Sequence, residues 1–153
     1  QLAYLTQTTL SLDDTSEIIK ILKQRFPSIE GPPKDDICYA TQNRQNAVKE
    51  LASQVDRILV VGASNSSNTL RLVEVAKAQG TEARRVEEAS QIEKADVEGV
   101  KSIGITAGAS APEDVVESIV AKLCELAPHN NVRELKLVDE NVNFALPALL
   151  RTA

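Results

Sequence analysis

The sequence is poor in the residues on which several classes of protein depend. Its 153 residues include two cysteines, one histidine, no tryptophan and only 3% aromatic residues. So few cysteines argue against a secreted disulfide framework and fit a reducing compartment, so we expect a cytoplasmic protein, or a stromal one if the source is a plant. Scarce aromatics disfavour a platform for stacking nucleic-acid bases. With one histidine, no Ser-His-Asp triad is expected.

Charge and hydropathy exclude two further classes. The formal net charge of -5 gives no electrostatic footprint for nucleic acid. No apolar run approaches the roughly 20 residues that cross a bilayer.

The length allows one domain with a core plus a fragment of another. Because the chain enters an apolar segment directly at Gln1, we expect it to be a piece of a longer protein.

Apolar runs alternate with amphipathic segments along the chain. The pattern predicts strands at residues 2–5, 58–62, 83–86, 100–106 and 132–138. It predicts helices over residues 13–25 and 43–54, around 70–76 and through 115–123. Alternating strands and helices are typical of an α/β fold built from βαβ units around a mostly parallel sheet. We expect this fold class.

Proline and glycine divide the chain near residue 33. Pro27, Gly31, Pro32 and Pro33 end the first helix and form a linker. We therefore expect residues 1–33 to end a preceding, similar α/β domain and residues 34–138 to form a complete one. Residues 139–153 are expected to be a C-terminal tail. The first piece should expose apolar surface, because it holds one strand and one helix only.

Residue types at helix ends suggest where helices begin and stop. Ser11, with Asp14 three residues on, is predicted to cap the first helix, and Thr41 the second. Ser110 with Glu113 suggests a capping box for the last helix. Gly80 suits the C-terminal end of the helix before it.

Three loops that follow predicted strands are rich in hydroxyl and amide side chains: residues 6–9, 64–68 and 106–110. In a parallel sheet such loops share the carboxyl edge, where helix N-termini offer free N–H groups to anions. The same residue types cap helices in every fold, but residues 64–68 hold more of them than one cap needs. We therefore predict a phosphate or diphosphate site. No P-loop or dinucleotide fingerprint is present, so ATP and NAD are not expected.

Cys38 lies in a polar loop directly before a predicted helix. A helix N-terminus favours the thiolate, which is the form that binds iron or zinc. Cys38 is therefore a candidate metal or cluster ligand. Cys124 follows Val120 and Leu123 in an apolar helix and is expected to behave as a small hydrophobic residue.

Four motifs in order resemble the LytB family, the 4-hydroxy-3-methylbut-2-enyl diphosphate reductases of the non-mevalonate isoprenoid pathway. They are TQTTLS at 6–11, DDICYATQNRQ at 35–45, VGASNSSN at 61–68 and TAGASAP at 106–112. The resemblance covers essentially the whole chain but only the C-terminal half of the family's length. It implies three α/β units around a 4Fe-4S cluster held by three cysteines, with the fourth iron open to substrate.

The resemblance also implies roles for particular residues. Cys38 would be the third cluster ligand, and Thr8 would position the allylic hydroxyl and relay a proton. The diphosphate would be bound by Ser66, Ser67, Asn68 and Ser110. The implied reaction is a two-electron reductive dehydroxylation that gives isopentenyl and dimethylallyl diphosphate. Ferredoxin or flavodoxin would supply the electrons.

The chain departs from the family pattern, because the first two cysteine ligands, the substrate-facing histidines and the proton-donating glutamate are missing. We therefore expect this chain alone to be inactive. One alternative is a non-enzymatic module that binds phosphosugars or other phospho-ligands through its serine-rich loops, which would leave Cys38 without a role. Another is a structural fragment that retains no activity.

Overall fold

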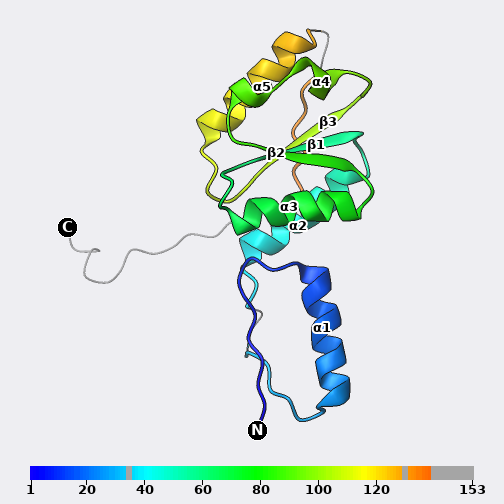
Figure 1. The fold of residues 1–153 in the computed structure, drawn as a ribbon, viewed down its shortest axis with the longest axis vertical. Helices are drawn as coiled ribbons and strands as arrows, with labels where there is room; N and C mark the ends of the chain where they lie inside the picture. Colours follow the sequence, from blue (N-terminus) through cyan, green and yellow to red (C-terminus); the bar gives the residue numbers. More distant parts are fainter. Residues whose placement is uncertain (34–35, 129–130, 139–153) are drawn as a thin grey trace, which may run out of the picture.

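The computed structural model describes residues 1–33, 36–128 and 131–138, and its centre is a three-stranded parallel sheet (Figure 1). Strand β1 (Arg57–Val61) lies between β2 (Glu82–Val86) and β3 (Ile103–Ala107). In register, Val60 lies between Arg85 and Thr106. The sheet confirms the predicted α/β class.

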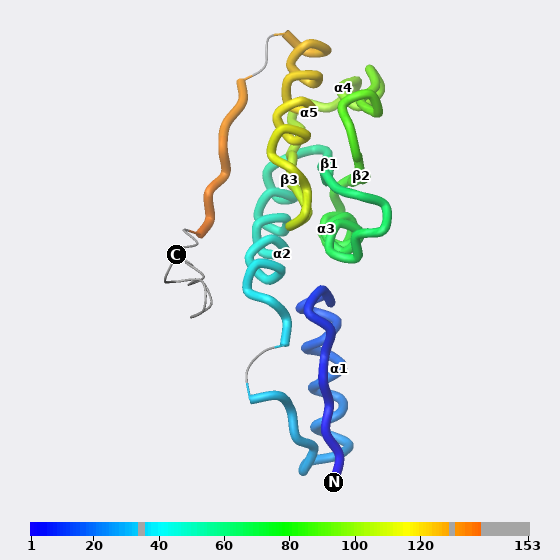
Figure 2. The backbone as a smooth tube through the Cα atoms, turned by 90° about the vertical axis from the view of Figure 1, so that its left-hand side faces the viewer, coloured from blue at the N-terminus to red at the C-terminus, as the bar shows by residue number. Residues whose placement is uncertain are grey.

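Helices cover both faces of this sheet (Figure 1). One face is covered by α2 (Tyr39–Ala52) and α3 (Ser67–Ala78). The other is covered by α5 (Glu113–Leu126), together with the 3-10 turn η1 (Ala89–Gln91) and α4 (Lys94–Val97). Helix α1 (Leu12–Arg25) lies outside these layers, as Figures 1 and 2 both show.

Strand β1 contributes side chains to the core on both faces of the sheet, because successive side chains of a strand point to opposite faces. Ile58 and Val60 pack with α2 and α3, whereas Leu59 and Val61 pack with α5. All four side chains are fully buried, each worth about 1.5–3 kcal/mol relative to exposure. The uninterrupted apolar run in the sequence follows from this burial on both faces.

Two predicted helix ends are confirmed. Ser11 caps α1, since its side chain accepts a hydrogen bond from the N–H of Asp14 at 3.2 Å. Helix α3 stops before Gly80, whose φ of +84° is readily adopted by glycine alone.

Two predicted caps are wrong. Helix α2 begins earlier than expected, with Cys38 and not Thr41 at the N-cap. Helix α5 begins after Pro112, so Ser110 does not cap it. The reason is that a capping box at Ser110 would place Ala111 inside the helix, and a residue before proline disfavours the helical conformation.

The predicted strands at residues 2–5 and 132–138 are also wrong. Ala3 forms only an isolated bridge with Glu30, and Leu5 is 82% exposed. Residues 131–138 form no ladder, because within the described residues β3 pairs with β1 alone. Strand β3 itself begins three residues later than predicted, since the N–H groups of Lys101 and Ser102 donate instead to the carboxylate of Asp56.

Residues 1–33 expose a row of large apolar side chains, as the sequence predicts. The exposed set is Leu2, Leu5, Ile18, Ile21 and Phe26. This segment is tied to the sheet domain through the first turn of α1, where Asp13 pairs with Lys49 of α2 and Asp14 with Arg71 of α3. Among the helices of the described residues, none has both the length and the apolar character for a membrane crossing. The predicted tail, residues 139–153, lies outside the described residues.

Candidate functional site

The loops that carry the predicted site residues gather at one edge of the sheet. Strands β1 and β3 are parallel, so the loops that follow them share the carboxyl edge. Helix α2 is joined to the start of β1 by only residues 53–56 and so runs antiparallel to it. The N-terminus of α2 therefore lies toward the same edge. Figure 2 shows α2 and α5 both starting at the end of the domain that faces residues 1–33.

Cys38 and Thr8 are brought together by a backbone hydrogen bond. Cys38 is exposed, and its N–H donates to the carbonyl oxygen of Thr8 at 3.3 Å. Cys38 is the N-cap of α2, and the first turn of this helix holds no acidic residue that would offset its partial positive charge. The predicted cluster ligand and the predicted catalytic residue thus lie on adjacent segments, although 30 positions separate them in the sequence.

Two further side chains hold the Thr8 loop against α2. Asp36 accepts a hydrogen bond from the N–H of Thr6 at 2.7 Å. Gln45 is fully buried; its amide nitrogen donates to the carbonyl of Leu10 at 2.7 Å, and its amide oxygen accepts from the N–H of Leu12 at 3.0 Å.

The sequence motifs alone give no particular role to Asp36 or Gln45. A signal for Gln45 was available, because it lies on the same helix face as the buried residues Thr41, Val48 and Ala52. A glutamine on such a face needs partners for both ends of its amide.

The loop between β1 and α3 presents Ser66 and Ser67 at a helix N-terminus. Ser66 is the N-cap, and its hydroxyl oxygen accepts hydrogen bonds from the N–H of Thr69 at 3.2 Å and from the hydroxyl of Thr69 at 2.9 Å. Ser67, the first residue of α3, is exposed. The first turn of α3 also lacks acidic residues, so this terminus is electrostatically open to an anion.

Asn68 is the most unusual residue of this loop. It is 8% exposed, and within the described residues neither its amide nitrogen nor its amide oxygen has a hydrogen-bond partner. An unpaired buried polar group costs about 1–3 kcal/mol. The amide lies beside the loop after β3, because a Cβ on Gly108 would be 3.7 Å from its nitrogen. Asn68 therefore places an unpaired amide at the junction of the two loops.

Ser110 lies two residues beyond Gly108 and is exposed. The loop that carries it is anchored to the sheet, since the N–H of Gly108 donates to the carbonyl of Val61 at 2.8 Å. Helix α5 differs from α2 and α3 because Glu113 and Asp114 occupy its first turn. These carboxylates offset the partial positive charge at the N-terminus of α5, so an anion beside Ser110 gains less from the helix dipole than one beside α2 or α3.

Glu87 at the end of β2 fixes the start of the Ser66 loop. Its carboxylate pairs with Arg85 and accepts the N–H of Ser64 at 2.6 Å. The bond with Arg85, followed by that with Ser64, lowers the pKa of Glu87, so the carboxylate stays charged at neutral pH. Arg85 also donates to the carbonyl of Gly62 at 3.2 Å.

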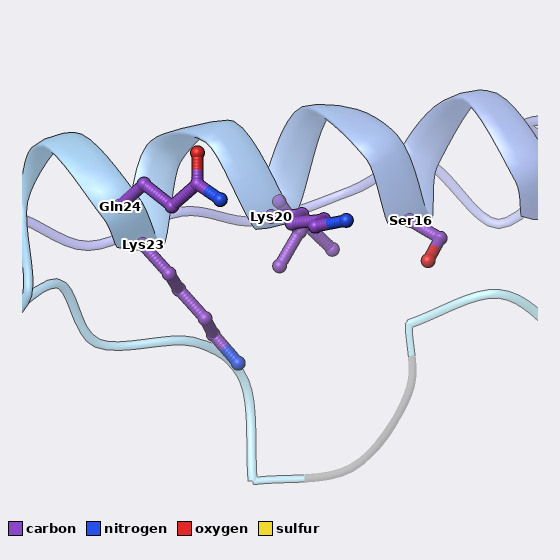
Figure 3. A pocket seen from close by; sticks show the side chains of 5 residues that line it. Ser16, Lys20, Lys23 and Gln24 are labelled. Carbon is purple, nitrogen blue, oxygen red and sulfur yellow. The ribbon is translucent and has the colours of Figure 1, made fainter.

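Two hollows of the described residues lie apart from this edge. Figure 3 shows one on α1, lined by Ser16, Ile19, Lys20, Lys23 and Gln24. The other is a groove between the outer edge of β3, α5 and residues 131–135, and Cys124 lines it. Neither hollow contains a predicted site residue.

Of the two cysteines, Cys38 is the one whose thiol lies at this surface, whereas Cys124 lines the groove beside β3. Within the described residues, no group of three or more His, Cys, Asp or Glu side chains could hold a metal ion. Cys38 is suited to be one ligand of a cluster, because it is exposed and lies at a helix N-terminus. A stable iron–sulfur cluster needs further thiolates beyond this one.

Comparisons with known proteins agree on one family. The family model described as LytB protein matches residues 1–124. A 4-hydroxy-3-methylbut-2-enyl diphosphate reductase from Idiomarina loihiensis is 54% identical over 150 residues, which are 98% of this chain and 48% of the relative. A reductase of the same name from Pseudomonas aeruginosa (strain LESB58) is 53% identical with the same coverage. The chain thus spans about half the length of the curated relatives it matches.

Solved structures give the same result. The E-1-hydroxy-2-methyl-but-2-enyl-4-diphosphate reductase from Plasmodium falciparum superposes with a TM-score of 0.79 at 35% sequence identity. The match covers 90% of this chain and 46% of that one. A structure of (E)-4-hydroxy-3-methyl-but-2-enyl diphosphate reductase, described as the terminal enzyme of the non-mevalonate pathway, superposes with a TM-score of 0.56 at 31% identity.

Proposed function

Since this chain belongs to the LytB family, we propose that it forms about half of an iron–sulfur reductase that removes the hydroxyl group of 4-hydroxy-3-methylbut-2-enyl diphosphate. The products would be isopentenyl and dimethylallyl diphosphate. In this proposal residues 34–138 are one complete α/β domain, and residues 1–33 belong to a preceding, similar one. The exposed apolar side chains of residues 1–33 support this division.

The diphosphate-binding part of the proposal rests on Asn68. Its buried amide offers a donor that is unpaired within the described residues, beside a loop on the neighbouring strand. Ser66 and Ser67 add hydroxyl donors at the N-terminus of α3, and Ser110 adds one from the loop after β3. A charge-assisted hydrogen bond from each donor contributes roughly 1.5–3 kcal/mol, so these loops can bind a diphosphate without lysine.

Cys38 is proposed as one of three thiolate ligands of a 4Fe-4S cluster, the others coming from residues beyond this chain. When bound, the cluster would supply two electrons and an iron that polarises the allylic C–O bond. Because the chain offers one thiolate at this edge, we propose that it is inactive alone. A ferredoxin or flavodoxin is the proposed donor, and the cytoplasm, or the stroma of a plastid, the proposed location.

Thr8 would act at the hydroxyl of the substrate. Its side chain is exposed, and its carbonyl is tied to the N–H of Cys38, so a substrate held near the thiol comes within its reach. In the balanced reaction the C–O bond breaks as the allyl group gains two electrons. The hydroxyl leaves as water with one proton, which Thr8 relays, and a second proton adds to carbon.

A chimera tests this function. The part of the Pseudomonas aeruginosa relative that the chain does not cover would be joined to this chain, and the purified protein assayed for iron and for isoprenoid diphosphate products. We expect a brown, active chimera. Cys38→Ser should lose both colour and turnover, whereas the matched control Cys124→Ser should keep both. An active, brown Cys38→Ser chimera would contradict the assignment, as would a colourless unsubstituted chimera that binds phosphosugars.

A further inference from the structure

Thr69 occupies the point where the two proposed diphosphate loops meet. It is fully buried in the first turn of α3. A Cβ on Gly62 would lie 2.4 Å from its hydroxyl oxygen, and a Cβ on Gly108 would lie 2.3 Å from the same atom. Real atoms do not approach so closely, so both strand ends reach this hydroxyl only because they carry glycine.

The Thr69 hydroxyl sets the direction in which Ser66 can hydrogen-bond. A hydroxyl oxygen has two acceptor positions and one hydrogen. The oxygen of Ser66 accepts from the N–H of Thr69 at 3.2 Å and lies 2.9 Å from its hydroxyl oxygen. The Thr69 hydroxyl is fully buried and has no other hydrogen-bond partner within the described residues, so it is the donor in this pair. With both acceptor positions filled, the Ser66 hydroxyl can act outward only as a donor. Ser66 is partly exposed, so this hydrogen remains free to bond to a ligand outside the loop.

We propose that Thr69 is a positioning residue that makes Ser66 an obligate hydrogen-bond donor to the diphosphate. The inference rests on the proposed function, because it explains why Ser66, a residue of the proposed diphosphate site, acts as a hydrogen-bond donor. It also bears on which ligands the site prefers. A Ser66 hydroxyl without this partner could accept as well as donate, and the site would then discriminate less between an anion and a neutral, donor-bearing ligand.

The test measures binding of inorganic diphosphate to the full 153-residue chain by calorimetry, with amide shifts of residues 66–69 as a second readout. Thr69→Val keeps the shape but removes the hydroxyl, and we expect about three- to tenfold weaker binding. Thr69→Ser restores the hydroxyl and should restore most of the affinity. In the chimera, Thr69→Val should raise KM for the diphosphate substrate and leave kcat close to its original value.

A matched control separates positioning from general stability. Thr81 is also buried and donates its hydroxyl to the carbonyl of Ala52 at 2.9 Å, at the opposite end of α3. Thr81→Val should lower the melting temperature to a similar extent but leave diphosphate affinity unchanged.

The outcomes distinguish this inference from the function on which it rests. Unchanged affinity in Thr69→Val overturns the role of Thr69 alone, and so does an equal loss in Thr81→Val. If the unsubstituted chain and chimera both fail to bind diphosphate, the proposed site itself is wrong, and the inference falls with it.

Discussion

Gln45 provides a direct test of how the Thr8 loop is held next to Cys38. Gln45→Leu keeps a side chain of similar size but removes the hydrogen bonds to the carbonyl of Leu10 and the N–H of Leu12, at 2.7 and 3.0 Å. Each lost bond costs about 1 kcal/mol, so opening of the loop should become easier by about 2 kcal/mol. That figure corresponds to a roughly 30-fold larger opening constant.

Amide hydrogen exchange measures this opening at atoms that Gln45 does not touch. The N–H groups of Cys38 and Thr6 donate to the carbonyl of Thr8 and the carboxylate of Asp36, so both are protected while the loop is docked. In Gln45→Leu their exchange should speed up by roughly 30-fold. The N–H of Val60, in the central strand, should keep its protection.

Gln54→Leu is the matched control, because Gln54 is exposed just after the same helix and bonds to the side chain of Glu50. It should leave the exchange of the Cys38 and Thr6 amides unaltered. If Gln45→Leu also leaves them unaltered, Gln45 does not hold the loop, and the reasoning from its buried amide is wrong.

Three further substitutions probe the site and the core. Asn68→Leu should raise stability by about 1 kcal/mol, because it removes an unpaired buried amide, and should weaken diphosphate binding; a less stable variant that binds normally would contradict the role of Asn68. Gly108→Ala should lower stability by about 1–3 kcal/mol, since its Cβ would lie 2.3 Å from the Thr69 hydroxyl oxygen, and adding Thr69→Ala should recover part of the loss in a denaturation series. Burial raises the pKa of Asp96, but hydrogen bonds from Arg84 and from the N–H of Glu93 lower it by more than burial raises it. The pKa therefore lies below its ordinary value of 3.8. Asp96 therefore stabilises the fold above that pH and loses this contribution as pH falls below it; denaturation at several pH values should show a steeper acid loss in the unsubstituted chain than in Asp96→Asn.

The parts of the fold that sequence could predict are those fixed by local pattern. The apolar run of β1 and the glycine that ends α3 required no knowledge of the rest of the chain. The start of α2 could not be predicted in the same way, because Cys38 and Thr41 both suit a helix end. Cys38 at the N-cap also makes a distant contact, the bond from its N–H to the carbonyl of Thr8, which no local pattern reveals. The strand predicted at residues 132–138 was wrong for a related reason. A pattern of alternating apolar and polar side chains does not show whether a neighbouring strand is there to pair with it.

The candidate site likewise has parts that the local sequence pattern predicts and parts that depend on distant contacts. Hydroxyl-rich loops after strands indicated an anion site, and the structure places those after β1 and β3 at one edge of the sheet and the Thr8 loop beside Cys38 at the N-terminus of α2. The sequence does not reveal Gln45 and Thr69 as residues that support the site, because their importance depends on burial and on partners from other segments. A buried polar side chain in an apolar helix face is the signal that could reveal such residues, and it becomes interpretable only once the packing is known.

The central claim is that the proposed diphosphate loops and the Cys38 thiol lie at the same edge of the domain. A nitroxide attached to Cys38 in the Cys124→Ser chain would test it through the broadening of amide signals. We expect strong broadening at residues 66–68 and 108–111, and little at Gly80 and Lys101, which lie at the opposite edge. Broadening at Gly80 and Lys101, with sharp signals from the two loops, would contradict it.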